Sequence, residues 1–161
     1  MILSGKRLNL LKTIEVMLPI NVNDLLEKNR VESNRIEFKE GWNPVRIYQS
    51  ICAFANDIDN LGGGYILVGV KEDNGKVVRP VCGLTEEELE DIQKKMIGFN
   101  NLIDPYYRPR TSIEPVDGKN IFVIWAPMGE ERPYAVPQDI TAKDKKYKYY
   151  IRSNSSSIEA K

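Results

Sequence analysis

Residues 62–70 read Gly-Gly-Gly-Tyr-Ile-Leu-Val-Gly-Val, and this stretch decides the fold. The segment from Tyr65 to Val70 is apolar on both faces of an extended chain, which predicts a central strand covered on each side. The three glycines before it are expected to end a helix and turn the chain tightly into the sheet. A Walker phosphate loop instead needs Gly-x4-Gly-Lys-Ser/Thr between a strand and a helix, so these glycines predict no ATP-binding loop.

Upstream of the glycines, strand and helix patterns alternate. A short helix is expected from Asp24 to Asn29, and Arg35 to Glu40 alternates polar and apolar residues as a half-buried strand does. Asn43-Pro44 is a typical helix start, because asparagine caps the first turn and proline fits it. The helical pattern continues to Asn60-Leu61, and its buried face is expected to contain Ile47, Ile51, Phe54, Ala55 and Ile58.

Downstream, the pattern predicts two hairpins, one helix and three strands. Asn74-Gly75 and Asp117-Gly118 are hairpin dipeptides, and Thr85 with Glu88 forms a capping box. The predicted strands are 110–116, 120–126 and 146–152, with Pro127 to Ala142 as a loop and Ser153 to Ser157 as a flexible polar segment. The order predicts one α/β (α+β) domain with a mixed β-sheet packed by two or three helices. The core is expected to contain Ile51, Phe54, Tyr65, Leu67, Val68, Val123 and Ile124.

Composition excludes several function classes. The 161 residues carry 23 basic and 23 acidic side chains, so a nucleic acid would have to be held by a local patch. Two cysteines and no histidine cannot build a zinc site of the usual kind within one chain, and Cys52 is expected to be a buried thiol. No apolar run reaches the roughly 18 residues of a membrane span, and no signal peptide is evident. These features predict a cytoplasmic protein.

Four segments, in this order and spacing, resemble the AlbA-like domain of the Schlafen type. They are Glu32–Lys39, then Phe54-Ala55-Asn56 followed by 63–70, then Glu72–Gly75, and finally Tyr149–Ser155. The domain is shared by bacterial proteins described as transcriptional regulators and by vertebrate Schlafens, and it has also been labelled a divergent AAA ATPase. The resemblance implies an AlbA-like fold and association with nucleic acid.

The resemblance also suggests how the chain is divided. Residues 1–21 are expected to form an N-terminal arm and residues 22–157 the AlbA-like domain. Residues 158–161 are expected to be an end cut from a longer protein with further domains. A homo-oligomer is one assembly that the sequence leaves open, and a membrane partner is not expected.

The last predicted strand carries the candidate nucleic-acid contacts. Its period places Tyr147, Tyr149 and Ile151 on one face. The other face is basic with one aromatic ring, suited to phosphates and to stacking on a base. With Lys39, the predicted nucleic-acid-binding residues are Lys39, Lys146, Lys148, Tyr150 and Arg152. The alternatives are a solvated strand face, or an edge strand that its lysines protect from aggregation.

Three carboxylates form a second candidate site. Glu32, Glu37 and Asp73 occupy positions that look like those of the ribonucleolytic Schlafens, a resemblance that implies a catalytic metal site. Converging carboxylates would bind Mg²⁺ or Mn²⁺, which can activate water for phosphodiester cleavage. The alternative roles are structural: Glu37 pairs with neighbouring basic side chains on its strand, and Asp73 starts the Asn-Gly turn.

We therefore expect a nucleic-acid-binding module, with DNA the expected polymer, from a transcriptional regulator. We expect binding rather than catalysis, and no cofactor other than Mg²⁺ or Mn²⁺. One alternative is a divalent-metal-dependent ribonuclease of the Schlafen kind that uses the three carboxylates. Another is an oligomerisation or protein-interaction module.

Overall fold

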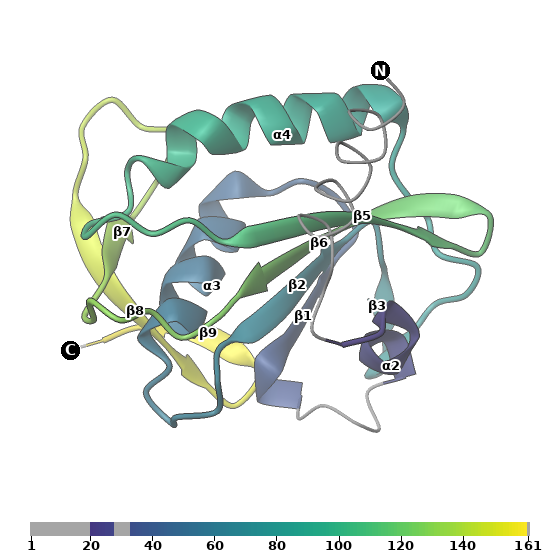
Figure 1. The fold of residues 1–161 in the computed structure, drawn as a ribbon, viewed down its shortest axis with the longest axis horizontal. Coiled ribbons are helices and arrows are strands. Elements are labelled where there is room, and N and C mark those ends of the chain that lie inside the picture. Colours follow the sequence, from purple (N-terminus) through teal and green to yellow (C-terminus); the bar gives the residue numbers. More distant parts are fainter. Residues whose placement is uncertain (1–19, 28–32, 161) are drawn as a thin grey trace, which may run out of the picture.

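The computed structural model describes residues 20–27 and 33–160 (Figure 1). The helices are α2 (Val22–Glu27), α3 (Pro44–Asn56) and α4 (Glu86–Asn100), with a short 3-10 turn η1 (Ser33–Arg35). The strands are β1 (Ile36–Lys39), β2 (Gly64–Val68), β3 (Glu72–Asp73), β4 (Lys76–Val77), β5 (Arg110–Val116), β6 (Lys119–Ala126), β7 (Ala135–Pro137), β8 (Tyr147–Ser153) and β9 (Ser156–Glu159).

The main sheet has four strands in the order β1-β2-β6-β5. β1 runs parallel to β2, while β2 and β5 are both antiparallel to β6, so the sheet is mixed. A mixed sheet with three helices confirms the predicted fold class. A second sheet contains β7, β8 and β9, and β3 and β4 form a separate hairpin.

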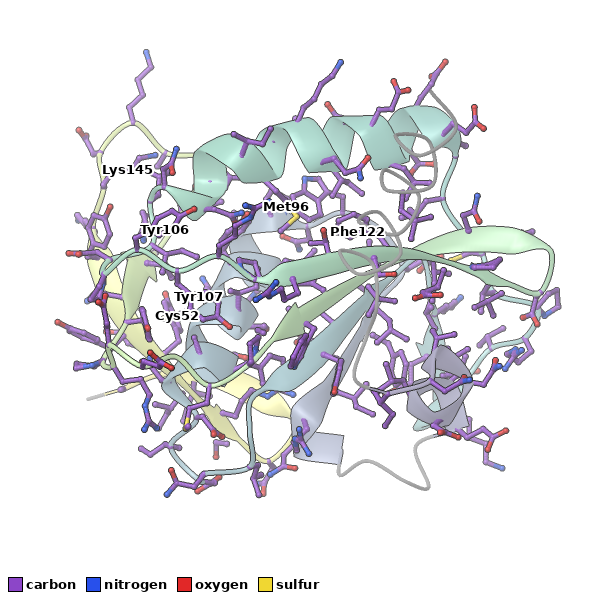
Figure 2. The ribbon with its side chains drawn as sticks, in the orientation of Figure 1. Cys52, Met96, Tyr106, Tyr107, Phe122 and Lys145 are labelled. Atoms are coloured by element: carbon purple, nitrogen blue, oxygen red, sulfur yellow. The ribbon has the colours of Figure 1, made fainter. Side chains whose placement is uncertain are left out.

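The central strand β2 is buried along its whole length, as its two-sided apolar sequence predicts. Ile66 and Val68 pack on α3 and α4, whereas Tyr65 and Leu67 face the apolar cluster that includes α2. Met96 of α4 and Phe122 of β6 belong to the same apolar cluster as Ile66 and Val68 (Figure 2). All seven residues predicted for the core are buried, which confirms that prediction.

Helix α3 lies between the two sheets, with the main sheet on one side and β8 and β9 on the other (Figure 1). Every residue from Ile47 to Ala55 is therefore buried, although several are polar. This arrangement corrects two predictions. The segment Pro127 to Ala142 contains β7, and Ser153 to Ser157 forms the turn and first residues of the β8–β9 hairpin.

The C-terminus of α3 also differs from the prediction. The helix ends at Asn56, because Asp57 adopts a left-handed conformation with φ 42° and ends the helical hydrogen bonding. The Asp57 carboxylate accepts hydrogen bonds from the backbone N–H groups of Leu61 and Gly62, at 2.8 and 2.9 Å. Ile58 therefore lies beyond the helix and is exposed, so its predicted burial is wrong.

Local sequence signals account for the other element boundaries. Asn43 caps α3, and Thr85 with Glu88 forms the predicted capping box of α4. Both hairpin dipeptides have positive φ at both residues, as tight hairpin turns of this kind require. The predicted buried thiol at Cys52 is confirmed, and burial raises its pKa to about 12. None of the described helices is long and apolar enough to cross a membrane.

Candidate functional site

Strand β8 buries the face that was predicted to be exposed, and exposes the other one. The two-residue period separates the faces correctly, but the face with Tyr150 and Arg152 packs on α3 and is not exposed. These two side chains are only 4% and 7% exposed, which corrects the expected open basic stripe. Lys148 on the same face is half-buried and pairs with Glu159 at 3.0 Å. Lys146, just before this strand, is exposed.

Arg152 is buried because its guanidinium meets partners from four elements. Its Nη1 donates to Ser157 Oγ at 3.0 Å and lies 3.7 Å from Glu37 Oε1, while its Nε donates to the Asn34 carbonyl at 3.1 Å. The same group lies over the Phe54 ring, 4.7 Å from its centroid. Burial lowers the pKa of Arg152, and the negative charge of Glu37 opposes that shift.

Glu37 and Lys39 both point toward the α3 side of the main sheet, at its edge strand β1. The register places Glu37 beside Ile66 and Lys39 beside Val68, the two β2 residues that face α3. Lys39 Nζ lies 3.6 Å from Glu37 Oε1, so Glu37 carries two ion pairs on one oxygen. Its other oxygen, Oε2, is buried and has no hydrogen-bond partner within the described part of the chain.

A polar pocket opens between β1, α3 and the β8–β9 hairpin. Its volume is about 190 Å³, and every lining residue is charged or polar. The lining residues are Glu37, Lys39, Arg46, Gln49, Ser50, Ser155, Ser156 and Ser157. Sequence reasoning identified only the first two. The signal for more lay in Gln49-Ser50, two polar residues inside an otherwise apolar helix, which indicate a polar neighbour.

The opposite face of β8 carries exposed aromatic side chains. Tyr147 and Tyr149 are 43% and 50% exposed, and Lys143, Lys145 and Lys146 are exposed just before them. β8 pairs with β7 on one side and β9 on the other, so it is a central strand and needs no protection from edge pairing. We call Tyr147, Tyr149 and two of these lysines, Lys143 and Lys145, the aromatic-basic face.

The predicted carboxylate trio is only partly visible, because Glu32 lies outside the described residues. Glu37 is already opposed by Arg152 and Lys39, and Asp73 is exposed in the β3–β4 hairpin, opposite Lys76. Across residues 20–27 and 33–160, no three His, Cys, Asp or Glu side chains gather where a metal ion could bind. The described residues therefore do not fit a divalent cation, and the trio stays a prediction.

Comparisons with known proteins agree on the type of domain. The N-terminal domain of a protein described as an ATP-dependent DNA helicase RecG-related protein, from Nitrosomonas europaea, has a similar structure, with a TM-score of 0.58. It is 29% identical, and the alignment covers 85% of this chain and 91% of that one. The DIP2311 protein of Corynebacterium diphtheriae shares the fold, with a TM-score of 0.54 and 19% identity. That alignment covers 97% of this chain but 27% of the other.

The family comparison is the more specific of these results. A search among curated proteins gave no match. The profile described as Schlafen, AlbA_2 matches residues 32–161, which is most of the chain and includes β1, β2 and β8. The chain therefore belongs to the Schlafen AlbA_2 family.

Proposed function

We propose that this domain binds single-stranded nucleic acid through the aromatic-basic face, as the nucleic-acid-binding module of a transcriptional regulator. The observation that carries the proposal is the pair of exposed tyrosines on the outer face of a central strand, preceded by exposed lysines. Proteins that bind single strands combine rings on which bases stack with cations that follow the phosphates. DNA is the expected polymer, since the similar protein is described as ATP-dependent DNA helicase RecG-related.

The geometry of β8 suits stacking. Tyr147 and Tyr149 are two residues apart, so their side chains leave the strand on the same face, about 7 Å from each other. Tyr106 is also exposed, in a segment tied to β7 through the bridge between Asp104 and Ala135. Figure 2 shows Tyr106 and Lys145 on the side of the molecule where β7 and β8 lie. This side therefore offers exposed rings and lysines to one strand of nucleic acid.

The test is a titration of fluorescently labelled single-stranded DNA, measured by anisotropy at several salt concentrations. Changing Tyr147 and Tyr149 together to Ala is expected to weaken binding by about 1–3 kcal/mol for each base that loses a stacking partner. The matched control changes both residues to Phe, which keeps the rings and should retain most of the affinity. A third variant, Lys143→Gln, removes one cation that neutralises a phosphate, so the slope of log K against log salt concentration should become shallower by about 0.7.

Equal affinity of the Ala and Phe variants would contradict the proposal. Light scattering on the same samples addresses the oligomerisation alternative. If the parent is a dimer and the Ala variant is a monomer with unchanged DNA affinity, the aromatic-basic face is a protein interface instead. RNA of the same sequence, run in parallel, measures the preference between the two polymers.

A further inference from the structure

We propose that the polar pocket beside Glu37 binds a phosphomonoester, the group found at a nucleic-acid 5′ end and on a free mononucleotide. This site is separate from the aromatic-basic face, and it does not depend on the function proposed above. The pocket lies on the helix-facing side of the β8–β9 sheet, whereas Tyr147 and Tyr149 lie on its outer side.

The charge of the pocket is the first argument. Lys39 and Arg46 line it, and Arg152 touches two of its lining residues, Glu37 and Ser157. The pocket and its wall therefore hold three cations and one carboxylate. A phosphomonoester carries a charge of about −1.5 to −2 at neutral pH, which matches this excess, whereas a phosphodiester would neutralise only half of it.

Hydrogen-bonding capacity is the second argument. Ser155 and Ser156 line the pocket with hydroxyl groups suited to phosphate oxygens, whereas the Ser157 hydroxyl donates its proton to Ser50 Oγ. Arg46, which also lines the pocket, adds guanidinium donors for the same oxygens.

Size and shape are the third argument. A cavity needs about 10–15 Å³ to hold one water molecule. The pocket, with a volume of about 190 Å³, therefore has room for a much larger group. Ser50, one of the lining residues, is buried, and its Oγ accepts a hydrogen bond from Ser157 Oγ at 3.0 Å. The pocket therefore reaches to a buried residue of α3, which favours the end of a strand or a free nucleotide over a chain that passes through.

The test compares phosphorylated and unphosphorylated forms of the same molecule by calorimetry. The pairs are a 5′-phosphorylated oligonucleotide with its 5′-hydroxyl form, and a mononucleotide 5′-phosphate with its nucleoside. The phosphorylated member should bind at least about tenfold more tightly, as expected for charge-assisted hydrogen bonds. A gain in both pairs identifies the free nucleotide as a sufficient ligand, and a gain with the oligonucleotide alone identifies the strand end.

The variant that probes the pocket is Arg46→Gln, because Arg46 is exposed in the first turn of α3 and its side chain bonds only weakly, to Gln49 Oε1 at 3.5 Å. This variant should lose the preference for the phosphate, whereas Lys94→Gln, at an exposed position on α4, should keep it. Circular dichroism confirms that both are folded. Equal binding of phosphorylated and unphosphorylated forms, or equal loss in both variants, overturns the proposal. If Arg46→Gln keeps the preference for the phosphate but loses single-strand binding, the pocket proposal is overturned. That result would also count against the aromatic-basic face as the site that binds single strands.

Discussion

Arg152 shows that a charged side chain can belong to the interior of this domain. Its guanidinium packs over Phe54, and its polar contacts come from two distant parts of the chain, Asn34 and Glu37 near the start of the domain and Ser157 near its end. Because the charge is removed from water, its partners must replace the lost hydration. The residue therefore joins the two sheets and contributes its charge from the interior, not from the exposed surface of β8.

This role predicts different effects for the two basic residues on the inner face of β8. Arg152→Ala should lower the free energy of unfolding by about 3–5 kcal/mol, because it leaves Glu37 without its buried partner. Lys148→Ala should cost no more than about 0.5 kcal/mol, since its pair with Glu159 is exposed on both sides. Urea denaturation followed by tryptophan fluorescence measures both values, and similar losses in the two variants would contradict this account.

At the scale of elements, the approach of β2 to α3 depends on one residue without a side chain. A Cβ atom at Gly64 would collide with the Phe54 ring and come within 2.7 Å of the Arg35 carbonyl oxygen. Gly98 in α4 has open space around the same position. The first glycine therefore sets the distance between helix and sheet, and the second does not.

Gly64→Ala should destabilise the domain by about 1–3 kcal/mol through overpacking. Gly98→Ala should stabilise it by up to about 1 kcal/mol, because alanine favours a helix and nothing obstructs its methyl group. Thermal unfolding of the two variants beside the parent checks both signs. A Gly64→Ala variant as stable as the parent would show that the helix can move aside without cost.

The turn between β5 and β6 is held by side-chain hydrogen bonds to the loop that follows β4. The Asp117 carboxylate accepts hydrogen bonds from Arg79 Nε and Nη2 at 2.7 and 2.6 Å, and from the Val81 N–H at 2.9 Å. The Arg79 hydrogen bonds, and then that of Val81, hold the pKa of Asp117 below its ordinary value of 3.8. The turn thereby fixes the loop after β4.

Because the folded-state pKa of Asp117 is depressed, its contribution to stability is present above pH 3.8 and is lost as the pH falls through the lower folded value. Asp117→Asn should therefore be less stable than the parent at neutral pH, and the difference should shrink in acid. Asn tolerates the positive φ of this position, so the turn itself survives. Denaturation curves between pH 7 and pH 2 provide the measurement, with Asp59→Asn as the exposed control. A constant difference across that range would refute the assignment.

At the scale of the whole molecule, local sequence patterns were sufficient to predict most helices and strands. They were not sufficient to predict which face of each element packs against the rest of the domain. The central strand, the two hairpin dipeptides and the capping box at Thr85 each depend on neighbouring residues, and the structure contains all of them, although β2 covers Gly64–Val68 and ends two residues before the predicted Val70. The orientation of β8 depends on a helix about a hundred residues away. A two-residue period separates the faces of a strand, but it does not say which face meets the core.

The candidate site follows the same rule. Glu37 and Lys39 could be selected from the family resemblance, whereas Arg46 and the serines at 155–157 join them only through the packing of α3 against β9. The period places Tyr147 and Tyr149 together on one face, but it does not identify that face as the outer surface. Contacts between distant segments carry this information, and one sequence without relatives does not display them.

The position of α3 between two sheets also constrains the order in which the protein can mature on the ribosome. Asn56 donates a hydrogen bond to the Tyr150 carbonyl 94 positions later, and Ser50 accepts one from Ser157, 107 positions later. Since synthesis runs from the N-terminus, one side of α3 must wait, uncovered, until nearly the whole domain has been translated. If translation stopped before β8, one apolar face of α3 would stay exposed to solvent. Chaperones, and the proteases that clear unfinished chains, recognise such exposed apolar segments.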